Sequence, residues 1–111
     1  MNVYDTANRL ASEIKESEEY VNYKMAKQTL NLNSSLKEKI ENFDRLRYEI
    51  QLTMMQTGKN DEEKNKQLQN EYAELVENPD AKKFFEAETK FNILIADVNK
   101  IIGEAIRDVM E

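Results

Sequence analysis

The chain has 111 residues, of which 34% are charged and 40% hydrophobic, with one proline, two glycines, no cysteine and no histidine. So few turn residues exclude a sheet protein, and the composition is typical of long helices and coiled coils. The net charge of −6 disfavours direct contact with nucleic acid or an anionic membrane, because both are negatively charged. Without cysteine the chain can build no disulfide, zinc knuckle, iron–sulfur cluster or thiol nucleophile.

Two short helices are predicted first. Apolar residues at spacings of three and four define a helix from about Val3 to Glu16; they are Val3, Ala7, Leu10, Ala11 and Ile14. Ser17 is a candidate N-cap for a second helix, whose first turn holds the acidic residues that the helix dipole favours. This second helix ends near Asn31 to Asn33 and directs Tyr20, Tyr23, Ala26 and Leu30 inward.

A long third helix is predicted from Ser34 to Thr57, a rod of about 36 Å, with Gly58 as its C-cap. Its core stripe has a seven-residue beat that Arg47 interrupts: Leu36, Ile40, Phe43, Ile50 and Met54. A second stripe holds Tyr48, Leu52 and Met55. The Met54-Met55 pair fits either an adaptable partner surface or gap-filling near the helix end.

A fourth helix is predicted to open with a capping-box variant formed by Asn60 and Glu63. Its apolar stripe is thin and consists of Leu68, Tyr72, Leu75 and Val76. Asn78-Pro79-Asp80 is the sharpest boundary in the chain, because these residue types suit an N-cap and a first helical turn. A weak echo between residues 33–37 and 78–82 fits either a duplication or caps that arose independently.

The fifth helix, predicted over residues 79–109, is apolar over more of its circumference than a surface helix requires. At about 45 Å it would overhang a compact domain, so its excess apolar face needs a partner, most simply a second copy. The residues expected to form the core and the self-association surface are Phe84, Phe91, Leu94, Ile95, Val98, Ile101, Ile102 and Ile106. Gly103 fits either close approach by a second helix or a bend near the terminus.

Catalytic patterns are weak. The chain has no histidine, which is the usual general base at neutral pH. It therefore also lacks the Glu-x-x-His pairs that di-iron and di-manganese bundle sites need. Glu71, Glu74 and Glu77 share a helix face, which is more typical of a solvated surface than of a metal site. Neither glycine has a companion at the spacing of a phosphate-binding loop. The sequence therefore predicts no enzyme, no cofactor and no metal.

Several segments resemble the YheA branch of the bacterial YlbF/YmcA family: 3–7, 17–20, 41–43, 86–88, 94–95 and 99–102. The resemblance covers nearly the whole chain, and its motifs are structural rather than catalytic. It implies an all-helical, oligomerising cytoplasmic protein. Better-studied relatives belong to a complex that influences mRNA processing by a membrane-tethered ribonuclease, and through it development. Some relatives hold iron–sulfur clusters on cysteines, which this chain lacks.

The sequence thus predicts one all-α domain over residues 1–111, with about five helices, two of them long. The predicted protein is cytoplasmic, spans no membrane and binds no nucleic acid directly. Its predicted function is non-enzymatic interaction or regulation by a homo-oligomer through helix–helix contacts, and the resemblance implies a link to mRNA processing or development. The alternatives are an RNA-associated accessory factor that binds nucleic acid directly and a structural protein.

Overall fold

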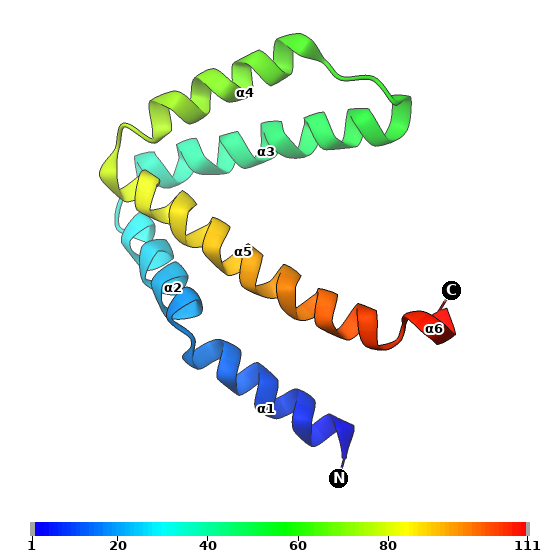
Figure 1. Ribbon diagram of the computed structural model, residues 1–111. Coiled ribbons are helices and arrows are strands. Elements are labelled where there is room, and N and C mark those ends of the chain that lie inside the picture. Colours follow the sequence, from blue (N-terminus) through cyan, green and yellow to red (C-terminus); the bar gives the residue numbers. More distant parts are fainter. Residues whose placement is uncertain (1, 111) are drawn as a thin grey trace. The chain divides into compact units, whose positions relative to one another are not determined.

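The computed structural model describes residues 2–110, and within this range the ordered elements are all helices (Figure 1). In chain order they are α1 (Val3–Glu16), α2 (Glu18–Asn31), α3 (Ser34–Thr57), α4 (Glu62–Leu75), α5 (Pro79–Ala105) and α6 (Arg107–Met110). The prediction of an all-α fold with two long helices, α3 and α5, is confirmed.

Side chains with a carbonyl, carboxylate or hydroxyl oxygen define most of the boundaries, because the first N–H groups of a helix have no partner within it. Ser17 Oγ accepts from the Tyr20 N–H at 3.2 Å and donates to the Ile14 carbonyl at 2.6 Å, so it ends α1 and begins α2. Asn33 Oδ1 accepts from the Leu36 N–H at 3.1 Å at the start of α3. Asn78 Oδ1 accepts from the Asp80 N–H at 2.9 Å at the start of α5.

The start of α4 differs from the prediction by one residue. Asp61, and not Asn60, is the N-cap, and its Oδ1 accepts from the Lys64 N–H at 3.1 Å. Glu62 and Glu63 then lie in the first turn, where the helix dipole favours acidic side chains. Asparagine and aspartate are nearly equal as caps, so residue type alone could not choose between two adjacent candidates.

The end of α5 also differs from the prediction. The helix stops at Ala105 rather than continuing to residue 109, and the single turn α6 follows after Ile106. The N–H groups of Val109 and Met110 both donate to the Ile106 carbonyl at 3.2 Å. Gly103, the residue of lowest helix propensity in this stretch, lies in the last turn of α5. The break divides the predicted seam near its C-terminal end.

The chain divides into two compact units. One unit runs from Gln28 to Lys83, and the other combines the described residues up to Lys27 with those from Phe84 onward. We call them the hairpin unit and the terminal unit. How they associate, and hence the prediction of one domain over residues 1–111, stays a prediction.

The hairpin unit is built on α3 and α4, which pack against each other as consecutive antiparallel helices (Figure 1). Its buried side chains include Leu36, Ile40 and Phe43 of α3 and Leu75 of α4. The Phe43 ring contacts Tyr72 with centroids 6.0 Å apart. Arg47, which interrupts the predicted stripe, lies 5.7 Å from the centre of the Phe43 ring and pairs with Asp44 at 2.8 Å. An arginine therefore covers the edge of this core without being buried in it.

The terminal unit is held together by aromatic side chains from α2 and α5. Tyr23 contacts both Phe84 and Phe91, with ring centroids 5.7 and 5.4 Å apart, and Tyr20 contacts Phe91 at 6.0 Å. The Tyr23 hydroxyl donates to Glu88 Oε2 at 3.4 Å, which gives its polar end a partner. Phe84 and Phe85 are buried. This aromatic cluster fixes the first half of α5 against α2.

Candidate interaction surface

The sequence-predicted residues on α5 form a gradient from buried to exposed. Phe84 is 4% exposed, whereas Phe91, Leu94, Ile95 and Val98 are partly buried. The remaining predicted residues are exposed: Ile101 at 69%, Ile102 at 48% and Ile106 at 44%. A single apolar stripe thus begins in the aromatic cluster and continues beyond it into solvent. Self-association through its exposed end stays a prediction.

We define distal α5 as residues 95–105. Its apolar positions repeat every seven residues, at 95 and 102 and at 98 and 105, and they continue the repeat of Phe84 and Phe91. A seven-residue repeat favours packing of neighbouring helices at a shallow crossing angle. Distal α5 therefore has the pattern of a helix that packs lengthwise against other helices.

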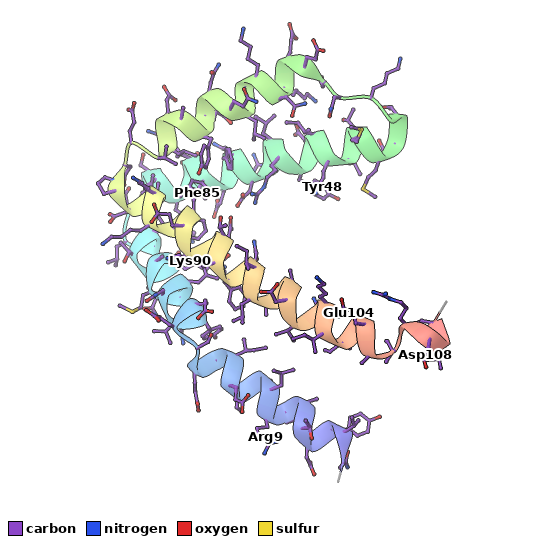
Figure 2. All side chains as sticks on the ribbon, in the orientation of Figure 1. Arg9, Tyr48, Phe85, Lys90, Glu104 and Asp108 are labelled. Atoms are coloured by element: carbon purple, nitrogen blue, oxygen red, sulfur yellow. The ribbon has the colours of Figure 1, made fainter. Side chains whose placement is uncertain are left out.

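Helix α1 adds a second uncovered apolar stripe, which the site prediction left out. Its pattern is the most one-sided in the chain, yet none of its residues is buried. Val3 and Tyr4 are each 75% exposed, and only Leu10 and Ile14 are partly covered. Figure 2 draws the side chains of both helices, with Arg9 labelled on α1 and Glu104 on distal α5. The sequence did contain a signal for this surface, because the apolar stripe of α1 is strong and few other segments of the chain are available to cover it.

Gly103 lies on distal α5 but away from the centre of its apolar stripe. A Cβ built at this position would meet no atom within 4 Å. Close approach by another helix of the terminal unit is therefore not the reason for this glycine. Its position two residues before the end of α5 agrees with the alternative prediction, a departure from regular helix near the terminus.

The predicted partner surface on α3 is also exposed. Met55 is 82% exposed and Met54 is 40% exposed, so Met55 does not fill a gap in the core. Tyr48, at 63%, and Leu52, at 37%, share its face of α3 because their spacing is four and three residues. A partner role for Met54 and Met55 stays a prediction.

Of the carboxylates considered for metal binding, Glu71 and Glu74 lie on α4, whereas Glu77 follows the end of this helix at Leu75, so the prediction that all three share a helix face is wrong. Glu63, Glu71 and Glu74 line a shallow open hollow together with Lys66, Gln67 and Asn70, all from this one helix. One Glu71 carboxylate oxygen is buried and has no hydrogen-bond partner. Among residues 2–110, no group of three or more metal-ligating side chains comes together.

No helix within residues 2–110 combines the length and the apolarity needed to cross a bilayer.

These features define a class: a small all-α protein whose most prominent surface is an uncovered helix face. The chain belongs to the YlbF/YmcA family, described as control of competence regulator ComK, whose model matches residues 3–107. The resemblance seen in the sequence is thereby confirmed.

Similar curated proteins bear the name UPF0342. One from Desulfitobacterium hafniense is 37% identical over 110 residues, covering 99% of this chain and 89% of the relative. Relatives from Alkalihalophilus pseudofirmus and Clostridium novyi are each 32% identical over 108 residues, or 97% of this chain, and cover 92% and 95% of their own lengths. The match therefore extends over both units of the chain.

Proposed function

We propose that this protein is a non-enzymatic regulator that works by binding protein chains through helix faces, and that it does so as a homo-oligomer in the cytoplasm. The family description concerns control of a competence regulator, which supports a regulatory role. The proposal includes a link to mRNA processing or development only through the better-studied relatives.

The observation that carries the proposal is the size of the exposed surface. The chain exposes 9033 Å², whereas a compact monomer of its mass, 13.1 kDa, exposes about 6,400 Å². Counting the hairpin and terminal units as two separate compact bodies of equal mass raises this value only to about 7,700 Å². Contact between the units can only lower the exposed area, so the two units taken separately exceed two compact bodies by at least about 1,300 Å². This excess is close to what one chain contributes to a homodimer interface.

The charge pattern favours protein partners over nucleic acid. Lys37 and Lys39 alternate with Glu38 and Glu41 along α3, and the whole chain carries a net charge of −6. A phosphate backbone requires a basic stripe, and its binding weakens steeply with salt. Apolar helix faces instead suit other helices, whose apolar stripes they can cover.

The test is affinity capture from cells that produce the protein, with and without ribonuclease treatment. We expect the same protein partners in both samples, reduced by Ile102→Glu, and no RNA binding by the purified chain at low salt. Met55→Glu, placed on α3 at a still more exposed apolar residue, asks whether the second exposed face takes part. Partners that disappear with ribonuclease, together with salt-sensitive RNA binding by the purified chain, would contradict the proposal and support the RNA-binding alternative.

A further inference from the structure

Two apolar stripes of the terminal unit lack a cover, and they have comparable lengths. Helix α1 has 14 residues, and distal α5 has 11, so the rods are about 21 Å and 16 Å long. The two helices run in opposite chain directions (Figure 1). One chain therefore offers two amphipathic rods of similar length, and two copies would supply the four that a four-helix bundle contains.

The charges on these rods allow a second copy to approach. Helix α1 carries three acidic residues, Asp5, Glu13 and Glu16, and two basic residues, Arg9 and Lys15. Distal α5 carries two acidic residues, Asp97 and Glu104, and one basic residue, Lys100. Each rod therefore has a net charge of −1. The two rods together carry −2 of the total charge of −6. Both signs are interspersed on each rod, so neither rod presents a one-sign patch that would repel its copy.

The exposed area of the chain also agrees with a second copy as the partner. The exposed surface exceeds that of two compact bodies by about 1,300 Å² per chain, and homodimer interfaces bury about 2,000 Å² or more in total. The exposed stripe of distal α5 also continues from the aromatic cluster of Tyr23, Phe84 and Phe91, so a second copy would extend an existing core. Isologous pairing applies the same patch from each copy and closes the assembly at two chains.

We propose that α1 and distal α5 of two copies assemble into an intermolecular four-helix bundle with two-fold symmetry. This inference rests on the homo-oligomer of the proposed function and specifies its interface. Ile101 and Ile102 lie inside the bundle with the stripe of α1, whereas Tyr48, Leu52 and Met55 on α3 remain outside it.

Thiol protection tests this arrangement, because the chain has no cysteine of its own. Three full-length single-cysteine variants are compared: Ala7→Cys on α1, Ile102→Cys on distal α5, and Met55→Cys on α3 as the matched exposed control. Each is treated with a maleimide reagent at a series of protein concentrations, and its mass is measured by light scattering in parallel.

At concentrations where the mass is twice 13.1 kDa, we expect the thiols at positions 7 and 102 to react at least about tenfold more slowly than the thiol at position 55, since labelling then requires opening of the bundle. Dilution to monomer should reduce the difference to what the unequal exposure of these positions within one chain produces. A dimer with only one of these positions protected, or neither, overturns the bundle but leaves self-association standing. A monomer at every concentration overturns both, and leaves the face open to a different protein.

Discussion

At the residue scale, Phe43 is the clearest test of the hairpin unit. It is 5% exposed and packs against Tyr72 and beneath Arg47. We expect Phe43→Ala to lower the free energy of unfolding by about 3 kcal/mol, because it removes a buried ring and leaves a cavity. The measurement is urea unfolding at fixed protein concentration, since self-association also contributes to stability.

Tyr48 provides the matched control for that experiment. It is an aromatic residue of the same helix but is 63% exposed, so Tyr48→Ala should change the free energy of unfolding by no more than about 0.5 kcal/mol. Equal losses from the two variants would mean that the core stripe of α3 is assigned to the wrong face.

A second residue-scale prediction concerns the start of α4. Asp61→Ala should lower stability by about 1 kcal/mol, because the Lys64 N–H loses its acceptor. Asn60→Ala, one residue earlier, should have little effect on the urea midpoint. The reverse ranking would restore Asn60 as the cap and contradict the boundary found in the structure.

At the element scale, local residue chemistry explains most helix boundaries. Asn33, Gly58 and the Asn78-Pro79 pair mark the ends of helices through strong and specific backbone preferences, so the sequence was sufficient to place them. The end of α5 was missed because the apolar repeat continues through Val109 although the helix does not. Periodicity reports which face a residue would occupy, and it does not report where backbone hydrogen bonding stops.

The two glycines should respond to substitution in opposite ways. Gly103 is helical and has open space around its Cα, so Gly103→Ala should stabilise the chain by up to about 1 kcal/mol. Gly58 adopts φ of +70° at the C-cap of α3, so Gly58→Ala should destabilise it by about 1 kcal/mol. Thermal unfolding followed by circular dichroism compares the two. If Gly103→Ala instead weakened self-association, a helix of the second copy would have to approach closely at this residue.

At the scale of the whole molecule, the excess exposed surface is the feature that the sequence predicted only in part. The width of the α5 stripe already indicated that some of it lacked a cover. Ile101 and Ile102 are indeed exposed, while Phe84 belongs to the core. Which residues of the stripe are buried and which are exposed could not be predicted, because this depends on where along α5 the contact with α2 ends. The exposure of α1 was missed for the same reason: burial depends on neighbours that are distant in sequence.

The most direct measurement of the central claim is the mass in solution by light scattering at micromolar concentration, for the wild type, Ile102→Glu and Met55→Glu. We expect a mass at least twice 13.1 kDa for the wild type and Met55→Glu. We expect 13.1 kDa for Ile102→Glu, with its helical circular dichroism retained, because Ile102 is 48% exposed within the chain and a charge there opposes only burial between copies. A monomeric wild type, or an Ile102→Glu variant of undiminished mass, would contradict the account.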